Sequence, residues 1–195
     1  MLICILGISN SGKSTIARYL KEAYGIKEVV SYTTRPPRQG EIDGREHYFI
    51  DEAKMDALLE SGETFAYTYD DKTNVSYCAL VKDVASSDDL VYIINPDGIE
   101  YIENHNSTVD YKVIYVDVSY EVAISRGLFR GDDIKVLQTR LKSELAEFEL
   151  YKSEGLYDYY IDGTKSVKEV QSEVDNIIKS IKGTIDNNWY LWYNN

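Results

Sequence analysis

The sequence predicts an α/β fold in which helices flank a parallel sheet and a phosphate-binding loop (P-loop) follows the first strand. Two observations lead to this prediction. Apolar segments rich in β-branched residues alternate with segments of helical periodicity, an order typical of parallel sheets. The first apolar segment, residues 2–6, also runs directly into a glycine-rich motif that opens a helix.

The glycine-rich motif is complete. It reads Gly7-Ile8-Ser9-Asn10-Ser11-Gly12-Lys13-Ser14 and matches G-x-x-x-x-G-K-[ST]. Its glycines allow a turn whose N–H groups converge on phosphate oxygens, and the following helix adds its positive N-terminal end. Lys13 supplies charge for the β- and γ-phosphates, and the Ser14 hydroxyl is a hard oxygen ligand for Mg²⁺. We expect ATP and Mg²⁺ to be held by Gly7, Ser9, Asn10, Ser11, Gly12, Lys13, Ser14 and Thr15. The alternative is a glycine-rich turn with a solvated lysine.

Composition and charge exclude several classes of protein. A chain of 195 residues forms one domain of ordinary size, and its net charge of −12 argues against nucleic-acid or anionic membrane partners. No apolar run reaches the length of a membrane span, and the apolar start lacks a basic leader. The two cysteines, Cys4 and Cys78, indicate small buried residues rather than a disulfide framework or a zinc site. We therefore expect a cytoplasmic protein.

Although the chain is acidic overall, Lys13 and the arginines are grouped in two segments. The first segment contains Lys13, Arg18, Arg35, Arg38 and Arg45, and the second contains Arg126, Arg130 and Arg140. Such grouping favours one local anion site, although scattered surface arginines are the alternative reading of the same count.

The elements that follow the P-loop are predicted in order. Apolar residues recur at helical spacing over residues 14–24, and Gly25 is a natural stop for this helix. A short strand is expected at residues 29–32. The next stretch, Ser31-Tyr32-Thr33-Thr34-Arg35-Pro36-Pro37-Arg38-Gln39-Gly40-Glu41, is held extended by its paired prolines. Arg35 and Arg38 project from it, and a guanidinium fork suits a phosphate. A solvated turn is the alternative.

Residues 33–87 are predicted to form a small α+β insertion. A strand at 46–50 leads to a helix that is capped by Asp51 and ended by Gly62. Alternating residues at 64–69 and a return at 75–77 predict a hairpin, and a helix is expected at 79–85.

The second half of the chain returns to alternating strands and helices. Asn95-Pro96-Asp97-Gly98 ends one strand and starts a helix, and a glycine-containing link at 128–133 carries Arg130. The expected strands are 90–94, 111–116 and 157–161, and the expected helices are 98–105, 119–127, 134–153 and 167–182. The tail at 184–195 contains Trp189, Tyr190, Trp192 and Tyr193 and fits no pattern, so packing, association and a loose end all stay open.

The P-loop, the Ser31–Glu41 run and the later arginines together resemble the guanylate kinase family, over residues 2–182. The resemblance implies a P-loop core at 1–32 and 88–183, a nucleoside-monophosphate-binding insertion at 33–87 and a helical lid at about 126–140. It implies an ATP-dependent (deoxy)nucleoside monophosphate kinase that acts on small-molecule nucleotides as a monomer or homodimer.

The same resemblance implies roles for particular residues. Arg35 and Arg38 hold the acceptor phosphate, helped by Tyr77 and by a tyrosine before Phe49, a position that His47 occupies here. Lys13 and the lid arginines act on the transferring phosphoryl group. The lid arginines are Arg126, Arg130 and Arg140, and Ser31 and Thr68 complete the expected acceptor site.

The sequence departs from the family where the family reads guanine. The family's glutamate falls on Ala66 and its aspartate on Asn95. A carboxylate accepts from both N1–H and the exocyclic amine of guanine, whereas Asn95 offers one donor and one acceptor and suits thymine, uracil or adenine. The resemblance makes GMP or dGMP the default acceptor. Ala66 and Asn95 predict that the base specificity is altered. The alternative is a small alignment shift in which Glu63 or Asp97 serves instead.

The expected chemistry needs no acid or base from the protein, so neither His47 nor His105 receives such a role. The acceptor phosphate is largely ionised at neutral pH, and catalysis consists of alignment and charge neutralisation. Two other functions compete: a non-catalytic guanylate-kinase-like module that binds a phosphorylated peptide, and a P-loop hydrolase or regulator. The intact P-loop argues against the first, and the Arg35 and Arg38 loop argues against the second.

Overall fold

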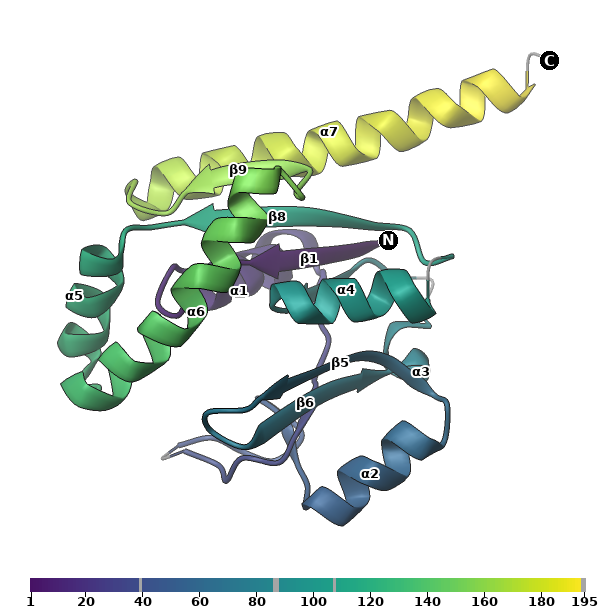
Figure 1. Ribbon diagram of the computed structural model, residues 1–195. Coiled ribbons are helices and arrows are strands. Elements are labelled where there is room, and N and C mark those ends of the chain that lie inside the picture. The colour runs from purple at the N-terminus through teal and green to yellow at the C-terminus, as the bar shows by residue number, and fades with distance from the viewer. Residues whose placement is uncertain (39, 86–87, 107, 194–195) are drawn as a thin grey trace.

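The computed structural model describes residues 1–38, 40–85, 88–106 and 108–193, and of residues 184–193 it describes only the helical backbone. Figure 1 shows the two parts of the molecule: a main sheet covered by long helices, and a smaller sheet with its own helices.

The main sheet is parallel throughout, as predicted. It contains β1 (Leu2–Leu6), β2 (Lys27–Glu28), β7 (Leu90–Ile93), β8 (Tyr111–Asp117) and β9 (Tyr159–Asp162) in the order β2-β7-β1-β8-β9. Every residue of β1 is buried, which explains its unbroken apolar sequence. The chain proceeds to β7 on one side of β1 and to β8 on the other, and ligands of such sheets bind at the carboxyl ends of the strands where the direction reverses.

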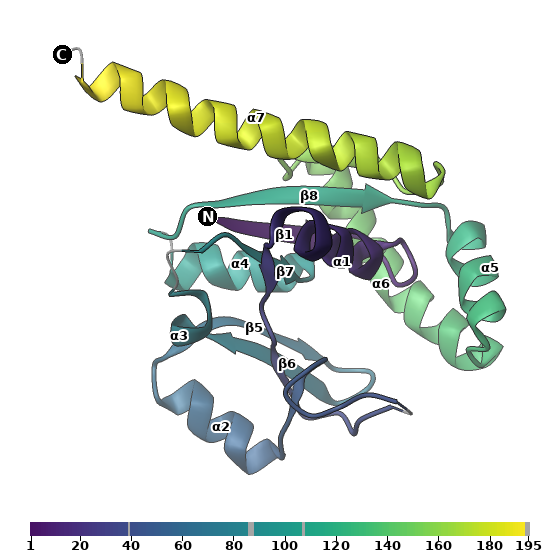
Figure 2. The ribbon, with the colours of Figure 1, turned by 180° about the vertical axis from the view of Figure 1, so that it is seen from behind.

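Helices cover both faces of this sheet (Figures 1 and 2). On one face α1 (Lys13–Tyr24) and α7 (Val167–Tyr193) pack against Ile3 and Ile5 of β1. On the other face α4 (Pro96–His105) and α6 (Ile134–Glu154) pack against Cys4 and Leu6. The alternating side chains of β1 therefore join two apolar cores, and α5 (Tyr120–Arg130) packs against α6 beside them.

The smaller sheet is mixed. It contains β3 (Tyr32–Thr33), β4 (Tyr48–Phe49), β5 (Thr64–Asp70) and β6 (Val75–Leu80) in the order β4-β3-β6-β5. The helix α2 (Glu52–Glu60) covers one face through Met55, and the short α3 (Val81–Val84) follows β6. Asp51 caps α2 as predicted, since its side chain accepts from the Lys54 N–H. β5 packs against α4, which places the small sheet below the main sheet in Figure 1.

Three predicted elements were wrong in extent. Of the strand expected at 29–32, only Tyr32 lies in a strand, because the chain crosses there from β2 in the main sheet to β3 in the small one; Val29 still donates to the Val91 carbonyl. The strand at 46–50 shortens to β4. The helix at 79–85 shrinks to α3, because Ala79 and Leu80 stay paired with β5.

The helices expected at 119–127 and 167–182 also extend further than predicted. α5 continues to Arg130 and ends at Gly131, which adopts a left-handed conformation with φ of 91°. The tail has helical backbone as far as Tyr193, as part of α7. The side chains of Trp189, Tyr190, Trp192 and Tyr193, and the last two residues, lie outside the described residues. Across the described part of the chain, no helix combines the length and apolarity that crossing a membrane requires.

Candidate active site

The P-loop connects β1 to α1 in a conformation that only glycine permits at its first position. Gly7 has φ of 146°, and a Cβ atom there would lie 2.3 Å from the Val116 carbonyl oxygen. Gly12, with φ of 114°, precedes α1. The Lys13 ammonium donates to the carbonyl oxygens of Gly7 at 2.5 Å and Ile8 at 2.9 Å. The loop therefore holds its own lysine against its backbone.

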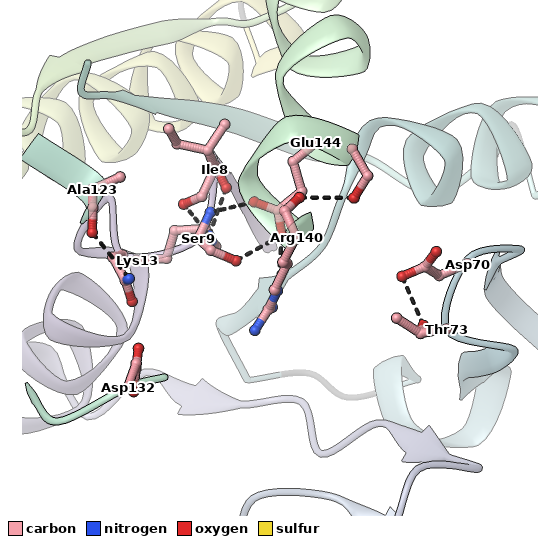
Figure 3. A network of polar contacts seen from close by, with 12 residues as sticks. Ile8, Ser9, Lys13, Asp70, Thr73, Ala123, Asp132, Arg140 and Glu144 are labelled. Carbon is pink, nitrogen blue, oxygen red and sulfur yellow. Dashed lines mark hydrogen bonds and ion pairs between the residues drawn. The ribbon is translucent and has the colours of Figure 1, made fainter. Parts of the chain in front are cut away.

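A carboxylate from a distant helix also contacts the loop. Glu144 of α6 accepts from the Ser9 N–H and from the Ser9 hydroxyl, both at 2.6 Å, and from Arg140 Nε at 3.0 Å (Figure 3). Burial lowers the pKa of Lys13 to about 8, an effect that Glu144 opposes and Arg140 reinforces. Two charged residues of α6, Glu144 and Arg140, thus lie close to Lys13 of the loop.

Arg126 of α5 donates hydrogen bonds to backbone carbonyl groups of the P-loop. Its guanidinium donates to the carbonyl oxygens of Asn10 at 3.2 Å, Ser11 at 2.9 Å and Gly163 at 2.6 Å. These three acceptors come from the P-loop and from the turn after β9. Arg126 therefore fixes the shape of the loop from the α5 side.

Asn10 and Arg130 form further hydrogen bonds between the P-loop and α5. Asn10 has φ of 64°, its amide donates to the Ala123 carbonyl at 3.1 Å, and its side-chain oxygen accepts from Arg130 at 2.7 Å. Arg130 also pairs with Asp132 at 2.6 Å. Of the three predicted lid arginines, the structure therefore holds Arg126 and Arg130 in contacts with the loop and with Asp132, while Arg140 pairs with Glu144.

Arg35 lies in the extended loop of the small sheet and is only 9% exposed. It forms a two-pronged pair with Glu41, at 2.6 and 2.8 Å, and Glu41 also accepts from the Arg38 N–H at 2.7 Å. Arg35 lowers the pKa of Glu41 to about 2. Arg35 Nε is buried and has no hydrogen-bond partner among the described residues, so one donor is left for a ligand.

Three further predicted acceptor residues gather around Arg35. Ser31 Oγ lies 2.9 Å from His47 Nδ1. The His47 ring packs edge-on against the Tyr77 ring, with 5.7 Å between the two ring centres. The Arg35 guanidinium lies 5.4 Å from the centre of the Phe49 ring. Burial, and then the charge of Arg35, lower the pKa of His47 to about 4, so this imidazole is neutral at pH 7.

Arg140 connects the two halves of the site electrostatically. Burial is the main cause of the lowered pKa of both Lys13 and Arg38, and repulsion by Arg140 adds to each shift. Arg35 also repels Arg38. We call Lys13, Arg140, Arg38 and Arg35 the cation row. Its members come from the P-loop, from α6 and from the loop of the small sheet, and their mutual repulsion is relieved by a polyanion.

The predicted base-reading positions lie on facing elements. Ala66 of β5 is 1% exposed and belongs to the core that β5 shares with α4. Asn95 caps α4, and its side-chain oxygen accepts from the Gly98 N–H at 3.1 Å. Thr68 approaches the same turn, because a Cβ at Gly98 would lie 3.1 Å from its methyl group. Neither Ala66 nor the occupied oxygen of Asn95 presents a carboxylate.

The two alternative carboxylates have different surroundings. Glu63 is exposed at the turn before β5. Asp97 is exposed at the start of α4, and its N–H donates to Glu147 of α6 at 3.3 Å. Burial, and then Asp97, raise the pKa of Glu147 to about 7.

Sequence reasoning missed Glu41, Glu144 and Glu147. The spacing of Arg140 and Glu144 is a readable signal, since residues four apart on a helix are neighbours. The contact between Glu144 and Ser9 joins residues 135 apart in the chain, and no local pattern indicates it.

The remaining P-loop residues fit magnesium and phosphate. Ser14 and Thr15 are exposed in the first turn of α1, and the buried Ser11 hydroxyl has no hydrogen-bond partner within the described part of the chain. The described residues contain no cluster of acidic, histidine or cysteine side chains that could hold a metal ion by itself. A Ser14 hydroxyl combined with substrate phosphates is a usual set of ligands for Mg²⁺.

Comparisons with known proteins agree over nearly the whole chain. The family model for guanylate kinase matches residues 1–181. A guanylate kinase of Clostridioides difficile (strain 630) is 30% identical over 192 residues, which cover 95% of this chain and 90% of that protein. A guanylate kinase of Rhodopseudomonas palustris (strain HaA2) is 31% identical over 150 residues, or 73% of this chain and 68% of that protein.

A solved structure supports the fold. The crystal structure of guanylate kinase from Anaplasma phagocytophilum superposes with a TM-score of 0.64, over 92% of this chain and 84% of that one, at 21% sequence identity.

Proposed function

The chain belongs to the guanylate kinase family, and from this premise we propose that it transfers the terminal phosphoryl group of ATP to a nucleoside monophosphate. GMP and dGMP are the default acceptors. The observation that carries the proposal is the cation row, which extends from the P-loop to the buried Arg35.

The donor nucleotide occupies the P-loop in this proposal. The N–H groups of the loop and the Lys13 ammonium bind the phosphates of ATP, and Arg126 keeps the loop in shape from behind. Mg²⁺, held by Ser14 and the phosphates, supplies charge neutralisation when bound. Lys13 must leave the carbonyl oxygens of Gly7 and Ile8 to reach the nucleotide.

The acceptor phosphate lies against Arg35, Arg38, His47 and Tyr77, with Ser31 holding the His47 ring. The free Nε of Arg35 gives this site a buried donor for a phosphate oxygen. His47 serves as a neutral hydrogen-bonding group, since its pKa is about 4.

The chemical step needs alignment more than proton transfer. An ionised oxygen of the acceptor phosphate attacks the γ-phosphorus of ATP, and the bond to the bridging oxygen breaks to release ADP. Lys13 and Arg140 neutralise the negative charge on the transferring group, and Arg38 holds the attacking phosphate in line. No described histidine is needed as a base.

Base selection is the finer part of the proposal. Ala66 has no polar side chain, and the Asn95 oxygen is engaged by the Gly98 N–H. Leaving a polar edge of the base unpaired in a closed pocket costs about 1–3 kcal/mol. A difference of this size is enough for the site to prefer one base over another. We therefore propose weakened discrimination in favour of guanine. The reaction takes place in the cytoplasm and uses small-molecule nucleotides, with the protein as a monomer or homodimer.

A panel of all ribo- and deoxynucleoside monophosphates, each with ATP and Mg²⁺, tests this function through formation of ADP and nucleoside diphosphate. We expect equal amounts of the two products with GMP or dGMP and measurable turnover with at least one other base. Absence of transfer to every monophosphate would overturn the proposal, and strict use of guanine would overturn the part that concerns Ala66 and Asn95.

A further inference from the structure

The carboxylate of Glu144 lies where the P-loop offers donors to a phosphate. It accepts from the Ser9 N–H and the Ser9 hydroxyl, both at 2.6 Å, and its side chain is only 19% exposed. Backbone N–H groups of a P-loop are the groups that bind phosphate oxygens. The Glu144 carboxylate therefore occupies the Ser9 N–H, a donor that a bound nucleotide also needs.

The same carboxylate interacts with both cations at this end of the cation row. It pairs with Arg140 Nε at 3.0 Å, and its charge acts on Lys13 by raising that residue's pKa. Figure 3 shows Glu144 and Arg140 next to Ser9, with the Arg140 guanidinium extending away from the loop. A single side chain thus satisfies a loop donor and partly neutralises two cations.

We propose that Glu144 is a positioning residue that occupies the P-loop in place of nucleotide phosphate and is displaced when ATP binds, which frees Arg140 for the transferring group. This inference rests on the proposed function, because it assigns ATP to the loop. A protein whose binding-competent form is only a fraction of the population binds its ligand more weakly by that same fraction. The Glu144 contact therefore lowers the affinity for ATP.

The contact also gives Arg140 an anionic partner when no substrate is bound. An unpaired arginine beside Lys13 and Arg38 is repelled by both; burial is the main cause of the lowered pKa of each, and the charge of Arg140 adds to it. Pairing with Glu144 compensates for this repulsion until the phosphates of ATP arrive. Binding of ATP then exchanges one anion for another around the same cations.

Loss of charge alone must be separated from loss of the contact. Any carboxylate near a triphosphate weakens binding by repulsion, so Glu144→Gln by itself does not distinguish the two. Glu144→Asp keeps the charge and shortens the side chain by one methylene, which takes the carboxylate out of reach of Ser9. Glu147→Gln is compared at about pH 8, above the Glu147 pKa of about 7, so that it removes a charge one turn further along α6, where the carboxylate accepts from the Asp97 N–H instead of contacting the loop.

The test is equilibrium binding of ATP with Mg²⁺ by calorimetry, without acceptor, to the full chain and these three variants. We expect both Glu144 variants to bind ATP about tenfold more tightly, the effect of one charge-assisted hydrogen bond. Glu147→Gln is expected to change the affinity by less than about twofold. Unchanged affinity in Glu144→Asp, or an equal gain in Glu147→Gln, would overturn the inference and assign the effect to charge.

Hydrogen exchange of the Ser9 amide in the nucleotide-free protein gives an independent readout. We expect faster exchange in Glu144→Asp than in the unaltered chain, and unchanged exchange would contradict the contact. Steady-state kinetics should show a lower KM for ATP in the variant. Failure of the proposed function is distinguishable: the unaltered chain then binds ATP but transfers no phosphoryl group, whereas failure of this inference leaves transfer intact.

Discussion

Lys13 shows how a single residue is tuned by its surroundings. Its ammonium is enclosed by the P-loop and repelled by Arg140, so its pKa is lowered to about 8 despite the opposing charge of Glu144. In the proposed complex, the phosphates of ATP favour the charged form and raise this pKa again. The free and the ATP-bound protein therefore respond differently to pH.

This difference predicts the pH dependence of the reaction. As pH rises through about 8, Lys13 of the free protein loses its proton, so kcat/KM for ATP falls. The fall in kcat comes at higher pH, because the ATP complex retains the proton. Initial rates between about pH 6.5 and 9.5 measure both profiles. A Lys13→Arg variant is the control, since arginine stays charged and the fall near pH 8 should vanish from its residual activity. Coincident profiles for kcat and kcat/KM would contradict the assignment.

His47 provides a second prediction at the scale of one residue. Burial and the charge of Arg35 hold its pKa at about 4, below the ordinary value of about 6.5. A phosphate bound against Arg35 adds negative charge and favours the imidazolium, so GMP should raise this pKa. NMR titration of the His47 ring with and without GMP measures the change. An ordinary value in the free protein, or a value that GMP leaves unchanged, would contradict the acceptor site.

At the scale of elements, the closeness of α5 to α6 and to the P-loop depends on Gly127. A Cβ at this position would lie 2.3 Å from Leu137 of α6 and 2.7 Å from the Asn10 amide. Leu137 is 4% exposed and has little room to move. The absence of a side chain at 127 therefore permits both the helix packing and the contact between Asn10 and Ala123.

This packing predicts opposite effects of two glycine substitutions. Gly127→Ala should lower the free energy of unfolding by about 1–3 kcal/mol, because it overpacks a tight contact. Gly183→Ala in α7 should raise it by about 0.5–1 kcal/mol, since a Cβ there meets no atom of the described residues within 4 Å and alanine favours the helix. Urea denaturation of both variants measures the changes. Equal effects, or a stabilised Gly127→Ala, would contradict the packing.

The elements also show what sequence patterns convey. Caps and periodicity predicted α1, α2 and α6 well, because Gly25, Asp51 and the apolar stripe of α6 act locally. The end of α5 was misjudged because Gly127 looks like a helix stop and instead serves close packing. The strand at 29–32 was misjudged because its division depends on two sheets that the sequence does not place.

At the scale of the whole molecule, the cation row assembles residues from three segments. The sequence identified every member, but it did not distinguish the three lid arginines from one another. Only the fold turns Arg126 and Arg130 toward loop carbonyls and Asp132, and brings Arg140 near Lys13 and Arg38. The partner of Arg140, Glu144, was missed because its contact with Ser9 depends on where α6 lies over the P-loop.

The cation row also explains how a strongly acidic protein could bind nucleotides, as the proposed function requires. A chain of net charge −12 repels nucleotides at a distance, so binding depends on cations concentrated at short range. In the proposed function, two phosphate sites that share Arg140 and Arg38 hold both nucleotides at once. Our central claim is that the row forms one continuous polyanion site.

The most direct test is the binding of one molecule that spans both sites, an adenosine and a guanosine joined through five phosphates. If the row is continuous, this compound binds with a stoichiometry of one and about a hundredfold more tightly than ATP, because its second half binds intramolecularly. Arg140→Ala and Arg38→Ala should each remove most of that gain while leaving the affinity for ATP less affected. An affinity no higher than that of ATP, measured by calorimetry on the full chain, would contradict the account.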